Sequence, residues 1–152
     1  MRCTTGMVTA VLALGLFVGP HMAHAAGKLG VMDAWIRAAP PDAEMMAGYA
    51  TLKNTGDVRI SILTVQSDTF REASIHETIV TQDVTKMREL SRLDIEPGET
   101  VEMRPGGRHL MLSGPRHAIA VGDKVGMVFL LNDGTRVPTY FDVIAAEGGA
   151  GE

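Results

Sequence analysis

Short apolar stretches separated by turn-forming residues make up most of the chain, and no segment carries apolar residues at a sustained helical spacing. Residues 60–65 and 139–144 are rich in β-branched and aromatic side chains, which suit the pleated, half-buried surface of a sheet. Asn, Asp, Gly and Pro gather between such stretches, as at 54–57, 105–107 and 132–134, and predict turns. Many short strands at this spacing predict an all-β sandwich or barrel rather than alternating strands and helices.

The N-terminal segment has a different pattern. Arg2 precedes an apolar run from Met7 to Val18, and small residues follow that end in Ala23-His24-Ala25. A charged start, an apolar centre and an A-x-A site predict a signal peptide that is cleaved after Ala25 and directs export. The apolar run is shorter than the roughly 20 residues that cross a bilayer, so we expect no stable membrane insertion.

Cleavage divides the chain into three parts. Residues 1–25 would be removed, 26–147 would form one compact domain, and the small, polar residues 148–152 would be a flexible tail. Arg2 is the only charged residue of the first part, so 13 basic and 18 acidic residues remain and the net charge becomes −5. The basic residues are scattered and form no stripe that could follow a phosphate backbone, which argues against a nucleic-acid partner.

Several function classes are excluded by what the mature chain lacks. Cys3 lies in the signal peptide, so a disulfide, thiol exchange and a blue-copper centre are all excluded. No G-x-S-x-G or comparable nucleophile motif occurs, and we therefore predict that the protein is not an enzyme.

The first candidate metal ligands lie in the run His109-Leu110-Met111-Leu112. Alternate residues of a strand share a face, so His109 and Met111 would project together while the leucines enter the core. One imidazole and one thioether side by side are half of a four-ligand metal site. His76 and Met87 flank residues 77–86, which we predict to be a loop whose hairpin-like return brings its two ends together.

The remaining histidine and methionines have less specific roles. We predict Met32, Met103 and Met127 as adaptable fillers of the core and His117 as a solvated loop residue. Met45 and Met46 lie in a segment, 40–47, whose prolines suggest a loop, and they could be exposed near a site or tucked beneath it. The four candidate ligands also have an alternative interpretation as ordinary surface histidines and core methionines.

The spacing of the four residues favours the metal site. His76, ten residues, Met87, twenty-one residues, His109, one residue and Met111 match the H-x10-M-x21-H-x-M pattern, and the chain in this respect resembles the periplasmic PCu(A)C copper-chaperone family. The resemblance extends to further segments across nearly the whole mature chain: 33–37, 48–50, 54–56, 96–99 and 105–112. It implies a cupredoxin-like Greek-key β-sandwich that holds one Cu(I) per chain on these four ligands, and a monomer.

Two differences from the family limit what the resemblance implies. Some members carry a methionine directly after the first histidine, where this chain has Glu77, so a fifth thioether is absent. Some also carry a C-terminal extension rich in histidine and methionine, whereas residues 147–152 contain neither. We therefore expect a single copper site.

Ligand chemistry independently indicates the oxidation state. Two imidazoles and two thioethers are neutral and soft to intermediate, which suits Cu(I) better than Zn²⁺ or Ca²⁺. By resemblance, the recipient of the copper would be the apo copper subunit of cytochrome oxidase or a Sco-type assembly protein. Two alternatives stay open: an adaptor module of the cell envelope, and a protein of copper storage or detoxification.

Overall fold

The structure is a computed structural model that describes residues 28–82 and 84–145. These residues form strands and loops without a helix, and none of them belongs to a helix long and apolar enough to cross a membrane. The predicted signal peptide, 1–25, and the predicted tail, 148–152, lie outside the described residues. The ten strands are β1 Leu29–Arg37, β2 Met45–Asn54, β3 Ile60–Gln66, β4 Phe70–Thr81, β5 Val84–Leu90, β6 Leu93–Ile95, β7 Thr100–Met103, β8 Arg108–Pro115, β9 Lys124–Leu131 and β10 Arg136–Ile144.

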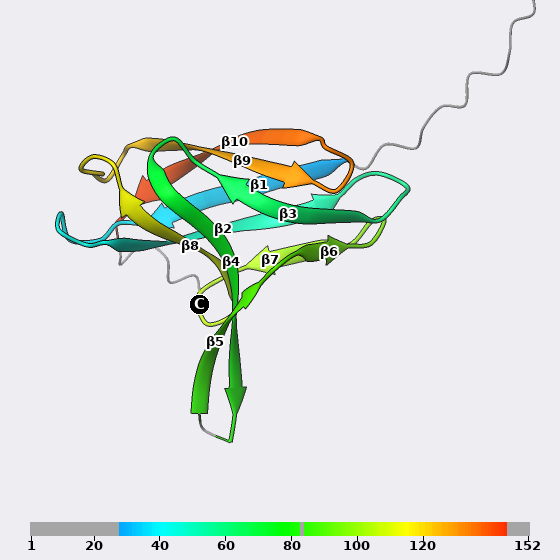
Figure 1. Cartoon of the computed structure of the whole chain (residues 1–152), viewed down its shortest axis with the longest axis horizontal. Coiled ribbons are helices and arrows are strands. Elements are labelled where there is room, and N and C mark those ends of the chain that lie inside the picture. The colour runs from blue at the N-terminus through cyan, green and yellow to red at the C-terminus, as the bar shows by residue number, and fades with distance from the viewer. Residues whose placement is uncertain (1–27, 83, 146–152) are drawn as a thin grey trace, which may run out of the picture.

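All ten strands belong to one sheet in the order β5-β4-β8-β7-β2-β1-β10-β9-β3-β6, with a further pairing of β2 to β8. The pairs are antiparallel except β1 with β10 and β7 with β8. The sheet curls so that β3 comes close to β4 without pairing to it, and the two halves enclose one core (Figure 1). The predicted all-β fold is therefore confirmed.

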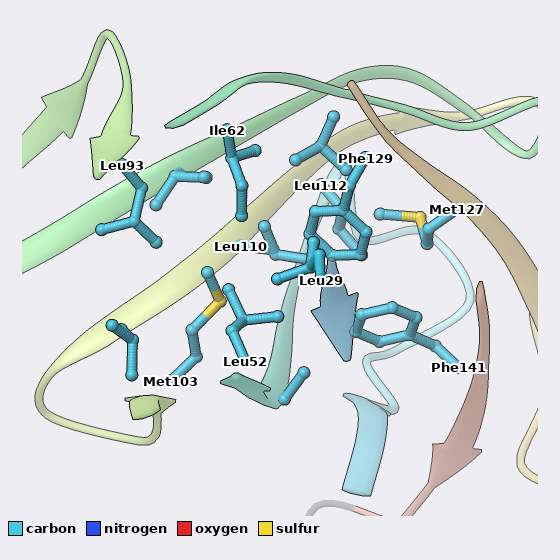
Figure 2. Packing of buried hydrophobic residues seen from close by; sticks show 14 of the residues in the cluster. Leu29, Leu52, Ile62, Leu93, Met103, Leu110, Leu112, Met127, Phe129 and Phe141 are labelled. Atoms are coloured by element: carbon cyan, nitrogen blue, oxygen red, sulfur yellow. The ribbon is translucent and has the colours of Figure 1, made fainter. Parts of the chain in front are cut away.

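The core lies between the two halves of the curled sheet. Phe129 of β9 and Phe141 of β10, whose ring centroids are 6.4 Å apart, lie near Leu110 and Leu112 of β8 (Figure 2). All four side chains are fully buried. Because burial of apolar area is the main force that stabilises a fold, this cluster fixes which face of β8 points inward.

A hairpin formed by the outer part of β4 and by β5 extends away from the body (Figure 1). β4 pairs with β8 only as far as Glu77, and beyond it the strand pairs with β5 alone. The prediction of a loop over 77–86 is therefore wrong, because β-branched residues such as Thr78, Ile79 and Val80 continue the strand. The predicted hairpin-like return is present: Thr81 pairs with Val84 across the turn.

Two further expectations about methionine-bearing segments also need correction. The loop after Pro40 and Pro41 is shorter than predicted, since β2 begins at Met45. Met32, predicted as core, is exposed because a bulge in β1 between Met32 and Trp35 changes which side chains face inward. Met103 and Met127, by contrast, are buried as predicted, and Met46 joins them in the core.

Candidate metal site

β8 presents its two candidate ligands on the face opposite the core. Leu110 and Leu112 alternate with His109 and Met111 along this strand, and the leucines are the inward-facing residues. Met111 is half-buried, and His109 is only 8% exposed although it points away from the leucines. The leucines of this run therefore face the core and His109 and Met111 face the other way, as predicted.

β4 places the third candidate ligand directly beside this pair. His76 lies opposite His109 in the register of β4 and β8, and Ser74 lies opposite Met111. The two imidazole rings are stacked, with centroids 5.9 Å apart and an interplanar angle of 28°. A metal–imidazole bond is about 2 Å long, so two rings that share one ion have centroids roughly 5 to 6.5 Å apart. The separation of these rings suits a shared ion.

Hydrogen bonding at His109 leaves one ring nitrogen for a metal. Nδ1 lies 3.1 Å from the carbonyl oxygen of Gly107. A carbonyl only accepts, so Nδ1 carries the proton and donates it, and Nε2 of the neutral ring keeps a lone pair. Ligating histidines in metalloproteins commonly donate their second N–H to a backbone carbonyl in this way.

His76 has a complementary arrangement. Its Nε2 lies 2.9 Å from the hydroxyl oxygen of Ser74, two residues earlier on the same face of β4. Its Nδ1 is buried and has no hydrogen-bond partner among the residues that the structure describes. When Nε2–H donates to Ser74, Nδ1 presents a lone pair that a bound ion would satisfy, which fits a role as a metal ligand.

Met87 completes the set from the projecting hairpin. It pairs with Thr78 on β4, and Thr78 shares a face with His76, so Met87 is the diagonal cross-strand neighbour of His76. Such neighbours lie about 7 to 8 Å apart, within reach of a long side chain. Met87 is 54% exposed, unlike the other three. The register thus brings all four candidates to one face, with a methionine on either side of the histidine pair.

Two other histidine and methionine side chains, His117 and Met45, lie outside the set of four. His117 is exposed in a bend, as predicted. Met45 is exposed and pairs with Ser113, one alternation beyond the pair Ala47–Met111, so it lies on the face of Met111. No group of three or more His, Cys, Asp or Glu within the described ranges could hold a metal ion. A metal centre here therefore needs the thioethers.

Sequence reasoning did not find the residues that support the histidines. Ser74 and the carbonyl of Gly107 each occupy one imidazole nitrogen. Ser74 and Gly107 both stand two residues before their histidine, so the alternation of side chains in a strand could have identified Ser74. A backbone carbonyl carries no such signal.

Comparison with known proteins identifies the family of this chain. Residues 29–143 match a family described as "Putative lipoprotein LpqE-like". The chain belongs to the LpqE-like family. This LpqE-like chain is 28% identical to "Putative lipoprotein Lxx21020" of Leifsonia xyli subsp. xyli, over 94% of the chain and 93% of that protein. It is 33% identical over 91 residues to "Uncharacterized protein RP573" of Rickettsia prowazekii, and that match spans 59% of the chain but only half of the Rickettsia protein.

Solved structures share the fold of the LpqE-like chain at lower identity. The copper-bound PCuAC domain from PmoF2 superimposes with a TM-score of 0.66 at 23% identity, over 80% of this chain and 97% of that domain. The apo form of DR1885 from Deinococcus radiodurans superimposes with a TM-score of 0.61 at 23% identity, over 99% of this chain and 97% of DR1885. The Cu(I) form of DR1885 superimposes with a TM-score of 0.59 at 24% identity, over 80% of this chain and 81% of DR1885. The predicted resemblance to PCu(A)C proteins is confirmed at the level of the fold.

Proposed function

We propose that this LpqE-like protein is a periplasmic copper(I) carrier. It holds one Cu(I) on His76, Met87, His109 and Met111 and delivers the ion to a respiratory haem-copper oxidase. The observation that carries the proposal is the direct pairing of His76 with His109, flanked on the same face by the two methionines. The copper-bound state of two proteins with this fold adds support.

The donor set favours Cu(I) over other ions. Four neutral ligands, two of them thioethers, stabilise a soft monovalent ion, whereas Ca²⁺ prefers oxygen ligands and structural zinc sites use thiolates and imidazoles. Thioethers do not form disulfides, so they keep their ligand function in an oxidising compartment. They also bind no proton, so the metal displaces none from them.

Carriage requires that the ion can leave, and the exposure of the ligands suggests a route. His109 is buried and Met111 is half-buried, whereas Met87 is largely accessible on the hairpin. A ligand of the recipient would first replace the Met87 thioether, and the more buried ligands would follow. Copper would thus pass toward the site of higher affinity without being released into solution.

The proposal is tested by titrating the mature chain, residues 26–152, with Cu(I) against a coloured competing chelator under anaerobic, reducing conditions. We expect one tightly bound ion per chain. Several ions per chain would favour storage or detoxification, and failure to compete with the chelator would contradict the copper site itself.

Delivery is tested by mixing the Cu(I)-loaded chain with the apo copper domain of cytochrome oxidase subunit II, or with an apo Sco-type protein, and separating the two. Copper that elutes with the recipient supports the carrier. An adaptor would bind its partner equally well when His76, Met87, His109 and Met111 are all replaced, and would transfer no copper.

Substitution of Met111 by leucine is expected to separate ligation from packing. The change conserves volume and should cost less than about 1.5 kcal/mol of the free energy of unfolding, whereas the loss of a thioether should weaken Cu(I) binding markedly. The matched control is Met127→Leu, because Met127 is buried in the core and should leave Cu(I) affinity unchanged. Equal affinity of Met111→Leu and the native chain would assign Met111 to packing alone.

Export predicts a defined N-terminus. Mass spectrometry of the protein recovered from the periplasm of an expressing bacterium should give a chain that begins at Ala26 and carries no lipid, because Cys3 lies within the segment that is removed. The family and the Leifsonia relative carry names that describe lipoproteins. A chain retained in the membrane fraction with a lipid-modified Cys3 would contradict this prediction.

A further inference from the structure

A carboxylate joins three strands on the face of the sheet opposite the candidate ligands. Glu77 of β4 binds Arg88 of β5 through Oε2, at 2.9 Å from Nη2, and Arg108 of β8 through Oε1, at 3.2 Å from Nε. In the register of the sheet Glu77 is directly opposite both arginines, so each ion pair runs straight across to the neighbouring strand. We refer to Glu77, Arg88 and Arg108 as the carboxylate clamp.

Each member of the clamp is the chain neighbour of one candidate ligand. Glu77 follows His76, Arg88 follows Met87, and Arg108 precedes His109. Successive side chains of a strand point to opposite faces, so the clamp lies directly behind the ligands rather than among them. The clamp therefore cannot coordinate the same ion, but its two ion pairs link the three ligand-bearing strands from the opposite face.

The clamp also lies where the hairpin leaves the body. Glu77–Arg108 is the last residue pair between β4 and β8. Beyond it, the described residues show one further bond from β4 to the segment just before β8, from the Thr78 N–H to the Gly107 carbonyl oxygen at 3.2 Å. Beyond this point the hairpin has no neighbour in the sheet (Figure 1). One oxygen of Glu77 thus holds the body through Arg108, and the other holds the hairpin through Arg88.

Burial suggests that the clamp acts on geometry more than on stability. The side chain of Glu77 is 23% exposed, whereas Arg108 and Arg88 are 39% and 62% exposed. Ion pairs with partners this accessible contribute little to folding. Their effect should instead be local, at Met87, which is the only candidate ligand on the hairpin and which lies one residue pair beyond the clamp.

We propose that Glu77 is a positioning residue for copper, which fixes the angle of the hairpin and thereby brings the Met87 thioether to the two histidines. The inference rests on the proposed function, because it assigns a role to Glu77 only if His76, Met87 and His109 bind the ion. Without the Glu77 carboxylate, the side-chain link from β8 to β5 is lost, and beyond the backbone pair Glu77–Arg108 the described residues leave one hydrogen bond, from Thr78 to Gly107, to restrain the hairpin. Met87 then samples positions outside the reach of the metal.

Glu77→Gln tests the proposal, because it keeps the shape of the side chain and removes its charge. Loss of groups that orient metal ligands weakens metal affinity by about 10- to 100-fold, and we expect about tenfold here since one of four ligands is affected. X-ray absorption at the copper edge should show two sulfur neighbours in the native chain and one in Glu77→Gln. The thermal unfolding midpoint, measured without copper, should stay close to that of the native chain.

A double-mutant cycle separates positioning from a general electrostatic effect. If Glu77 acts through Met87, then Glu77→Gln in a Met87→Leu background should weaken Cu(I) binding no further, whereas independent effects would add. Glu72→Gln is the control for charge: Glu72 is an exposed carboxylate of the same strand, on the face of His76, for which the described residues provide no ion pair. It should leave both affinity and sulfur count unchanged. Arg88→Gln removes only the ion pair between Glu77 and the hairpin, at a more exposed side chain. It should show the same loss of affinity and of one sulfur neighbour as Glu77→Gln, and it keeps the test available if Glu77→Gln folds poorly.

The possible results distinguish this inference from the proposed function. Two sulfur neighbours and native affinity in both Glu77→Gln and Arg88→Gln would overturn the clamp while leaving the copper site intact. Additive losses in the cycle would also overturn it, because they would show that Glu77 acts independently of Met87. Failure of the native chain to bind Cu(I) would overturn the proposed function and, with it, the role of Glu77.

Discussion

Replacement of His109 by glutamine is expected to weaken Cu(I) binding by more than about 100-fold, the upper end of what the loss of an outer-shell group costs a metal site. His109 lies opposite His76, its Nδ1–H is held by the Gly107 carbonyl, and its Nε2 keeps the lone pair. The substitution therefore removes a bond to the metal itself, from the most buried of the four candidate ligands. The measurement is competition for Cu(I) with a chelator, on protein shown to be folded by circular dichroism.

The matched control for His109 is His117→Gln. His117 is exposed, and its Nδ1 bonds to the neighbouring carbonyl of Ala118, so its replacement should leave the affinity for Cu(I) within about twofold of the native value, the spread expected for a surface substitution. If His109→Gln keeps native affinity, the ion does not lie between β4 and β8. If both variants lose affinity equally, the histidines act by general surface binding rather than as a site.

Half of the candidate site could be predicted from local sequence alone. A strand fixes the relation of His109 to Met111 through its two-residue alternation, and the adjacent leucines indicate which face is the core. The pairing of His76 with His109 could not be predicted in this way, because the register between strands far apart in the chain is set by tertiary contacts. The ligand spacing indicated that the four residues belong together without indicating how they meet.

The expectations that failed did so for identifiable physical reasons. Prolines at 40 and 41 restrict only their immediate neighbours, so β2 can begin at Met45. Within β2, Ala47 pairs with Met111. Asp33 adopts a φ of 49° within the bulge of β1, and the shift in register there exposes Met32. The carboxylate clamp also requires knowledge of the register, since Arg108 is 31 residues from Glu77 and meets it only through the pairing of β4 with β8.

Leu110→Ala is expected to lower the free energy of unfolding strongly. Leu110 is fully buried beside Leu112 and the aromatic residues of β9 and β10 (Figure 2). Removing a buried leucine side chain costs about 2 to 5 kcal/mol, from lost burial and from the cavity left behind. For a domain whose total stability is about 5 to 15 kcal/mol, this is a large fraction, and urea unfolding followed by circular dichroism would measure it.

Leu63→Ala is the control for this effect, because Leu63 also lies on a strand but is exposed, and its loss should cost less than about 0.5 kcal/mol. The folded fraction of Leu110→Ala should still bind one Cu(I), since the side chain points away from the ligands. A cost below about 1 kcal/mol would contradict the assignment of Leu110 to the core. It would equally contradict the placement of His109 and Met111, because neighbours in a strand face opposite ways: the same alternation that buries Leu110 is what presents its two neighbours to the metal.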